Sequence, residues 1–170
     1  MKIAILNGSP RKQNTAALAE AFAAGAKAAG HEVEILQVGR MNIGGCHGCE
    51  YCHTKGGGKC VQKDDMEKVL PAYLESDMIV FASPVYYFGV TAQLQAAIQR
   101  MYCIGKPAKA KKAALILSSG SPDTGRGAVQ SYRDMLGYMG IEDAGVFAFA
   151  GDENKSEEKL AALRAFAETL

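Results

Sequence analysis

Four cysteines lie close together in the chain, and their spacing is typical of a metal centre. Cys46, Cys49 and Cys52 form a C-x₂-C-x₂-C pattern, and Cys60 follows after seven further residues. Iron–sulfur clusters need soft thiolate ligands, and four thiolates at this spacing can surround one cluster. We therefore predict that these cysteines act as one unit, with a [4Fe–4S] cluster as the first hypothesis for what they hold.

Two other interpretations of the same cysteines remain open. Zinc fits an equally compact set of ligands, and His47 or His53 would replace one cysteine in such a site. The other interpretation is that the four cysteines are free thiols on a loop that binds no metal. A fifth cysteine, Cys103, lies at the end of a predicted helix, where we expect it to serve packing.

The first fifteen residues combine a buried strand, a turn and a group of anion-binding side chains. Residues 3–6 form a continuous apolar run, the Asn7-Gly8 turn ends it, and a helical segment follows from about residue 16. A strand that turns directly into a helix presents backbone N–H groups and the positive end of the helix dipole, which favour a phosphate. Candidate side chains for that phosphate are Ser9, Arg11, Lys12, Asn14 and Thr15.

Two common nucleotide motifs are absent from this segment, and one simpler explanation of it remains. No Gly-Lys-Ser/Thr follows Gly8, and no G-x-G-x-x-G is present, which argues against a nucleoside triphosphatase and against the Rossmann dinucleotide fingerprint. The simpler explanation is that Asn14 or Thr15 only caps the helix.

A second unusual loop covers residues 83–89, Ser-Pro-Val-Tyr-Tyr-Phe-Gly. Pro84 is rigid, Gly89 is expected to supply a permissive backbone, and the aromatic side chains between them can pack against a flat ring. The alternative is that the aromatic residues cap the sheet or form a subunit interface. A third loop, residues 119–125, also follows a buried apolar segment.

Strand and helix patterns alternate along the whole chain, with no internal repeat or linker. Pro71 is expected to shorten the second helix, and residues 39–63 form a long irregular loop that contains the four cysteines. Expected strands are 3–6, 31–38, 77–82, 111–118 and 141–150; expected helices are 16–29, 65–74, 91–103, 127–139 and 156–170.

Five alternations predict an α/β fold with one doubly wound parallel sheet, in which the strand order is 2-1-3-4-5. Ligands bind such sheets where the strand order reverses, at the carboxyl ends of strands one and three. Loops 9–15, 83–89 and 119–121 meet at that edge. A phosphate at one end of a pocket and a ring at the other end describe a mononucleotide, and in this fold FMN.

Size and charge exclude several classes of protein. The 170 residues predict a single domain, 1–170, and the net charge of +1 gives no footprint for nucleic acid. No apolar run is long enough to span a membrane, and no signal-peptide layout is present, so we expect no membrane partner and a cytoplasmic location.

The phosphate and aromatic loops together resemble the NADPH-dependent FMN reductase family of flavodoxin-like proteins, and the cysteine pattern resembles its iron–sulfur flavoprotein branch. The resemblance covers essentially the whole chain and implies a three-layer flavodoxin-like fold. It implies that the FMN phosphate is held by Ser9, Arg11, Asn14 and Thr15; that the isoalloxazine is lined by Pro84, Val85, Tyr86, Tyr87, Phe88 and Gly89, with Ser119 and Gly120 beside them; and that Cys46, Cys49, Cys52 and Cys60 bind the metal.

This combination predicts an FMN-dependent oxidoreductase that takes electrons from NAD(P)H or a reduced carrier. The acceptor is a quinone-like molecule, a flavin or a protein, and a [4Fe–4S] cluster would relay single electrons. The alternative is a flavodoxin-like electron-transfer protein without small-molecule turnover, but flavodoxins are commonly very acidic and this chain is nearly neutral. The aromatic loop and the resemblance both predict a homodimer or homotetramer.

Overall fold

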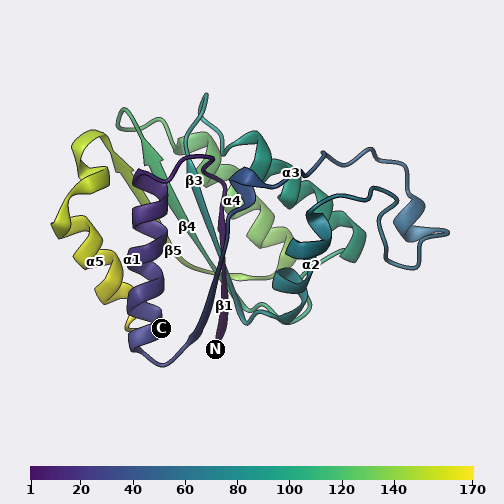
Figure 1. The fold of residues 1–170 in the computed structure, drawn as a ribbon, viewed down its shortest axis with the longest axis horizontal. Helices are drawn as coiled ribbons and strands as arrows, with labels where there is room; N and C mark the ends of the chain where they lie inside the picture. Colours follow the sequence, from purple (N-terminus) through teal and green to yellow (C-terminus); the bar gives the residue numbers. More distant parts are fainter.

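The computed structural model describes residues 1–170 and contains one five-stranded parallel sheet. The strand order is β2-β1-β3-β4-β5, as the sequence predicts (Figure 1). Each neighbouring pair is parallel, so all five carboxyl ends lie at one edge of the sheet. The strands are β1 (Lys2–Asn7), β2 (Glu32–Leu36), β3 (Met78–Pro84), β4 (Lys112–Ser119) and β5 (Glu142–Ala150).

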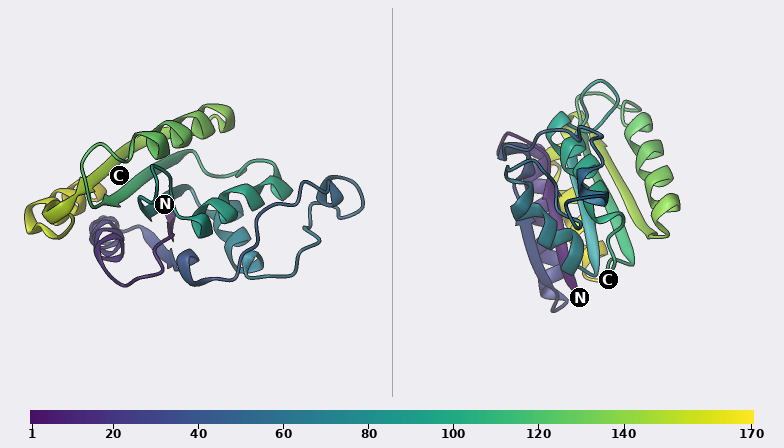
Figure 2. Two further views of the ribbon diagram at one scale, coloured as in Figure 1. Left: turned by 90° about the horizontal axis from the view of Figure 1, so that it is seen from above. Right: turned by 90° about the vertical axis from the view of Figure 1, so that its right-hand side faces the viewer.

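Five α-helices cover the two faces of the sheet and complete three layers. Helices α1 and α5 pack side by side on one face, and α2, α3 and α4 lie on the other (Figures 1 and 2). No helix combines the length and apolar character needed to cross a membrane. The helices are α1 (Asn14–Ala28), α2 (Met66–Glu75), α3 (Ala92–Arg100), α4 (Arg126–Met139) and α5 (Glu157–Ala167).

The central strands are buried on both faces, which explains their continuous apolar sequences. Every residue of β3 is buried, and successive side chains enter different cores because side chains alternate across a strand. Phe81 contributes to the core beneath α2, α3 and α4, whereas Val80 contributes to the core beneath α1 and α5. The outer strands β2 and β5 are only partly buried, as expected for edge strands.

Helix ends follow the local chemistry, with one correction to the sequence analysis. Thr91 begins α3, where its side chain accepts a hydrogen bond from the N–H of Leu94 at 3.3 Å. Pro71 does not shorten α2, which continues to its last residue, Glu75. Pro71 removes the N–H that would bond to the carbonyl of Glu67, but Glu67 is exposed and water can satisfy that carbonyl.

The long loop between β2 and α2 extends away from the sheet beyond α2 and α3 (Figure 2, left). Its only regular structure is two 3₁₀ turns, η1 (Val38–Arg40) and η2 (Tyr51–His53). The four clustered cysteines therefore lie at one end of the molecule, on the α2 and α3 side of the sheet.

Candidate functional site

The turn after β1 has its shape set by the buried side chain of Asn7. Its Oδ1 accepts a hydrogen bond from the N–H of Ser9 at 2.9 Å, and its Nδ2 donates to Gln37 Oε1 at 3.0 Å. Gly39 of η1 packs directly against this turn: a Cβ at Gly39 would lie 2.3 Å from the carbonyl carbon of Ser9. The loop that carries the predicted phosphate ligands is thus fixed from two sides.

Helix α1 begins at this loop with its N-terminus open. The N-cap residue is Gln13, and no side chain caps the helix. The alternative that Asn14 or Thr15 serves only as a cap is therefore wrong. Thr15 instead shares a buried hydrogen bond with Ser118 of β4, with 2.7 Å between the two hydroxyl oxygens. Uncapped N–H groups and the helix dipole give this position the chemistry of an anion site.

The three predicted loops meet in one polar pocket of about 210 Å³ at the carboxyl edge of the sheet. This placement follows from the parallel topology, because β1, β3 and β4 are neighbours and all end there. The predicted residues that line the pocket are Ser9, Arg11, Asn14, Thr15, Pro84, Val85, Tyr86, Ser119 and Gly120. The remaining predicted residues, Tyr87, Phe88 and Gly89, lie outside its lining.

The pocket is also lined by four residues that the sequence analysis did not identify: Gln13, Ser118, Gly151 and Asn154. Asn154 belongs to the 3₁₀ turn η4 (Gly151–Lys155), which follows the carboxyl end of β5. It is buried, and its Nδ2 donates to the carbonyls of Ser119 and Gly151, both at 2.8 Å. Its Oδ1 is buried without a partner. The rule that ligands bind beyond strand ends, applied to the fifth strand as well, points to this turn.

The aromatic loop forms a tight turn above the pocket. Tyr86 and Gly89 exchange two backbone hydrogen bonds, at 3.0 and 3.1 Å. Between them, Tyr87 and Phe88 have positive φ values of 46° and 66°. The expectation that Gly89 supplies the permissive backbone is thus wrong, because the unusual conformations lie on the two aromatic residues. Backbone strain of this kind costs about 1–3 kcal/mol a residue and is concentrated at functional sites.

The side chains at the tip of this turn are directed to solvent. Tyr87 is fully exposed at 101%, and Phe88 is exposed at 62%. Gly127 at the start of α4 supports the turn, since a Cβ there would lie 2.9 Å from the carbonyl oxygen of Phe88. The turn therefore holds two aromatic side chains outside the body of the protein at the mouth of the pocket.

One further cavity borders the polar pocket, and another lies beyond the aromatic turn. One, of about 460 Å³, lies between α4 and β5 and shares Val85 and Ser119 with it; Arg126 and Arg133 are on its wall. The other is a more apolar cleft of about 270 Å³ between α3 and α4, which begins at Gly89. The cavity between α4 and β5 is therefore continuous with the lining of the polar pocket, whereas the apolar cleft is separate from it.

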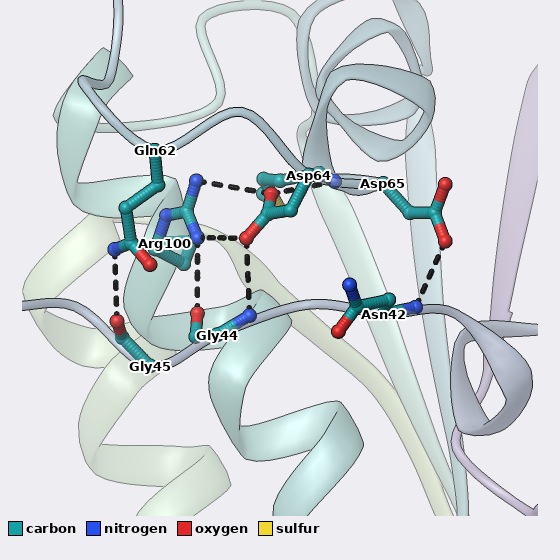
Figure 3. Close-up of polar contacts among 8 residues, drawn as sticks. Asn42, Gly44, Gly45, Gln62, Asp64, Asp65 and Arg100 are labelled. Carbon is teal, nitrogen blue, oxygen red and sulfur yellow. Dashed lines mark hydrogen bonds and ion pairs between the residues drawn. The ribbon is translucent and has the colours of Figure 1, made fainter.

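The cysteine loop is closed at its base by a buried ion pair (Figure 3). Arg100, the last residue of α3, donates to Asp64 at 2.6 and 3.2 Å and to the carbonyl of Gly44 at 3.0 Å. Asp64 also accepts the N–H of Gly44 at 3.0 Å, and Gln62 donates to the carbonyl of Gly45 at 2.9 Å. These bonds join the two ends of the loop to each other and to α3.

The ion pair sets the charge state at the base of the loop. Burial acts to raise the pKa of the Asp64 carboxyl, but hydrogen bonds from Arg100, Gly44 and Met66 outweigh it and leave the pKa below its ordinary value. Burial likewise acts to lower the pKa of Arg100, but Asp64 and the neighbouring Cys60 sulfur leave it raised. Both groups are therefore charged at neutral pH.

The four predicted metal ligands surround one small hollow beside Arg100. Cys46, Cys49, Cys52 and Cys60 all line it, together with the buried Cys103. Its volume is about 20 Å³, enough for roughly one water molecule. No three His, Cys, Asp or Glu side chains converge there in metal-ligating geometry. The donor set has the soft chemistry that iron or zinc requires, but the loop must open to admit a cluster.

Contacts around the hollow also bear on the two alternatives for the cysteines, a zinc site with a histidine ligand and free thiols. His53 Nε2 is 3.0 Å from the carbonyl oxygen of Tyr102, and the two rings meet edge to face. The N–H of Gly48 donates to the Cys46 sulfur at 3.4 Å. Burial raises the pKa of the Cys52 thiol, and its neighbours Cys60 and Glu50 add to the effect. Cys103 is buried, as a packing role requires, but it also lines the hollow.

Comparison with known proteins agrees with this architecture. The chain is 42% identical over 100 residues to an iron-sulfur flavoprotein of Archaeoglobus fulgidus, an alignment that covers 59% of this chain and 48% of that protein. It is 30% identical over 114 residues to FMN-dependent NADH:quinone oxidoreductase 2 of Pseudomonas aeruginosa, covering 58% and 56%. The chain thus spans about half the length of the curated relatives it matches.

Solved structures share the same fold. An NAD(P)H:quinone oxidoreductase from Methanothermobacter marburgensis superimposes with a TM-score of 0.72 at 19% identity, covering 99% of this chain and 94% of that one. A sequence model of the NADPH-dependent FMN reductase family matches residues 1–155. With the flavodoxin-like sheet and the family match in agreement, the chain belongs to the NADPH-dependent FMN reductase family.

Proposed function

We propose that this protein is an FMN-dependent oxidoreductase that takes electrons from NAD(P)H or a reduced carrier. The observation that carries the proposal is the single polar pocket in which loops from β1, β3 and β4 meet. Two features fit a flavin mononucleotide: the uncapped N-terminus of α1, and the buried Oδ1 of Asn154, which has no partner. Family membership supports both the cofactor and the electron donor.

In this proposal each loop has its own task. The phosphate is held by Ser9, Arg11, Asn14 and Thr15, with the N-terminus of α1 adding positive potential. Pro84, Val85, Tyr86, Ser119 and Gly120 would hold the isoalloxazine, and Tyr87, Phe88 and Gly89 form the adjoining turn. FMN, when bound, would supply the redox chemistry as an acceptor of hydride from a reduced nicotinamide. The protein binds and orients the flavin and shields one side of it from water, so no side-chain acid or base is required.

The electron acceptor is a small quinone-like or flavin molecule, or a protein. The cavities beside the pocket support a small molecule, and the exposed aromatic turn supports a macromolecular contact. Anaerobic mixing of the FMN-loaded protein with NADH or NADPH tests the donor, because flavin absorption bleaches on reduction. Steady-state turnover with quinone, ferricyanide or free FMN then tests the acceptor. Flavin that is never reduced by either nicotinamide would instead identify an electron carrier.

We further propose that the four clustered cysteines hold a [4Fe–4S] cluster. Their common hollow and the relatives named iron-sulfur flavoproteins support this proposal. Such a cluster would exchange single electrons when bound. Anaerobic reconstitution with iron and sulfide, followed by metal analysis, tests it: about four irons for each chain is expected. Stoichiometric zinc, or no iron uptake, contradicts the cluster while leaving the FMN proposal intact.

We propose, finally, that the protein works as a homodimer or homotetramer in the cytoplasm. The support is the exposed aromatic surface at the mouth of the pocket, formed by Tyr86, Tyr87 and Phe88. A neighbouring subunit placed there would cover these rings. Light scattering at micromolar concentration tests this assembly, and a mass of only 18 kDa, that of one chain, contradicts it.

A further inference from the structure

The hollow that contains the cysteines has an unusual neighbour in Arg100. The Arg100 side chain is only 2% exposed, yet its Nε–H has no hydrogen-bond partner. The other guanidinium nitrogens have partners: Nη1 donates to Asp64 and Gly44, and Nη2 donates one of its two N–H groups to Asp64. A buried donor without a partner costs free energy unless a ligand or another group eventually satisfies it.

The position of Arg100 limits which group that can be. Arg100 and Cys60 line the same hollow, and the Cys60 sulfur is close enough to affect the guanidinium. Among the four predicted ligands, Cys60 is the one outside the C-x₂-C-x₂-C group. The Asp64 ion pair occupies the edge of the guanidinium formed by Nη1 and Nη2, and Gly44 takes the second N–H of Nη1 (Figure 3). The edge with Nε–H and the second N–H of Nη2 is therefore left for a sulfur acceptor.

We propose that Arg100 is a positioning residue for the four clustered cysteines. Arg100 donates a hydrogen bond from its Nε–H to the Cys60 thiolate once that thiolate holds a metal. The inference rests on the proposed role of the cysteines as ligands. A similar N–H to sulfur contact already exists at Cys46, from the backbone of Gly48. Two of the four sulfurs would then have a donor, which orients ligands and offsets the negative charge of four thiolates.

The same residue also closes the base of the loop, so the test must separate these two roles. Arg100→Lys retains the positive charge beside Asp64 but lacks the Nε–H of the guanidinium fork. The probe is Zn²⁺ alone, titrated anaerobically into the reduced protein in competition with a chelator. Loss of an outer-shell partner typically lowers metal affinity 10- to 100-fold, and that is the loss expected for Arg100→Lys.

The decisive comparison repeats the substitution in a Cys60→Ala background, where three thiolates remain. If Arg100 acts through Cys60, Arg100→Lys has no further effect on Zn²⁺ affinity there. An equal loss in both backgrounds shows that Arg100 only closes the loop, and overturns the inference. No loss in either background overturns it as well. Failure of the wild-type protein to bind Zn²⁺ or iron contradicts the cysteine site itself, and the inference with it.

A measurement on the wild-type protein covers the case in which Arg100→Lys does not fold. The Nε–H proton of Arg100, followed by NMR, is expected to shift when Zn²⁺ binds. In the Cys60→Ala variant the resonance of the same proton is expected not to shift when Zn²⁺ is added. A resonance that does not respond to Zn²⁺ in the wild type overturns the proposal. FMN binding is the control for folding in every variant, because the FMN pocket and the cysteine hollow share no lining residue.

Discussion

The hydroxyl of Thr15 lies 2.7 Å from the hydroxyl of Ser118, and this buried contact joins the first turn of α1 to the end of β4. The two residues are 103 positions apart in the sequence, but both line the polar pocket. Parallel topology brings them together, because β1 and β4 flank β3 and end at the same edge. The phosphate end of the proposed FMN site is therefore supported by the strand that carries the third loop.

The side chains of the first loop are expected to contribute directly to FMN affinity. Arg11→Ala and Thr15→Ala should each weaken binding by about 1.5–3 kcal/mol, the usual range for hydrogen bonds to a charged group. Lys12→Ala is the matched control, since Lys12 is an exposed cation next to Arg11 but does not line the pocket. Calorimetric titration with FMN measures all three; an effect of Lys12→Ala as large as that of Arg11→Ala places the phosphate elsewhere.

Gly39, which packs against the first loop, is also expected to contribute to FMN affinity. Gly39→Ala should lower both stability and FMN affinity, because its Cβ would collide with the backbone of Ser9. Gly137→Ala is the control: it lies within α4 with no atom near its Cβ position, so it should stabilise the protein by about 1 kcal/mol. Urea unfolding and FMN titration report the two effects. Unchanged FMN affinity in Gly39→Ala would falsify the proposed support of the loop.

The aromatic turn is expected to be conformationally strained. Phe88→Gly should stabilise the FMN-free protein by about 1 kcal/mol, because glycine adopts a positive φ without steric cost. The same substitution should weaken the assembly of subunits, since it removes an exposed aromatic ring from the proposed interface. Tyr86→Gly, at a position without positive φ, is expected to give no gain in stability. Equal stabilisation by both substitutions argues against strain at Phe88.

The buried ion pair at the base of the cysteine loop predicts a specific acid sensitivity. Because the pKa of Asp64 is lower in the folded protein than its ordinary value of 3.8, its stabilising contribution is complete above that value. The contribution is lost as the pH falls through the lower, folded-state pKa. Asp64→Ala should cost about 3–5 kcal/mol at neutral pH, because it leaves the Arg100 charge buried and unpaired.

Unfolding measurements between pH 2 and pH 7 test this prediction, with Asp64→Asn as the isosteric comparison. The difference in stability between wild type and Asp64→Asn should shrink as the pH falls below about 4. A Glu67→Ala variant, which removes only an exposed ion pair with Lys63, should have little effect. A difference between wild type and Asp64→Asn that is independent of pH shows that the charge of Asp64 is not what stabilises the loop.

The sheet and the position of the pocket were predictable because they depend on local patterns that repeat. Apolar runs such as residues 113–117 identify buried strands, and five strand–helix alternations permit few topologies. The loops at the carboxyl ends then have to share an edge. The residue types at that edge, together with the fold, already indicated FMN, and the resemblance agreed with that ligand and assigned residues to each part of it.

What the sequence could not predict depends on contacts between distant segments. The positive φ of Tyr87 and Phe88 is imposed by the strand end and by α4, and no local pattern of aromatic residues signals it. The same is true of Asn154, which bonds within its own turn to Gly151 but also to the carbonyl of Ser119 at the end of β4, 35 positions away. The ion pair between Asp64 and Arg100 joins residues 36 positions apart on separate elements.

The most direct test of the FMN site is to compare the binding of FMN with that of riboflavin, which lacks the phosphate. The flavin-free protein, titrated anaerobically, is expected to bind one FMN for each chain. It should bind riboflavin about 100-fold or more weakly, because several charge-assisted hydrogen bonds, each of about 1.5–3 kcal/mol, are lost with the phosphate. Equal affinity for the two flavins, a preference for FAD, or no binding of FMN would contradict a site built on the loop between β1 and α1.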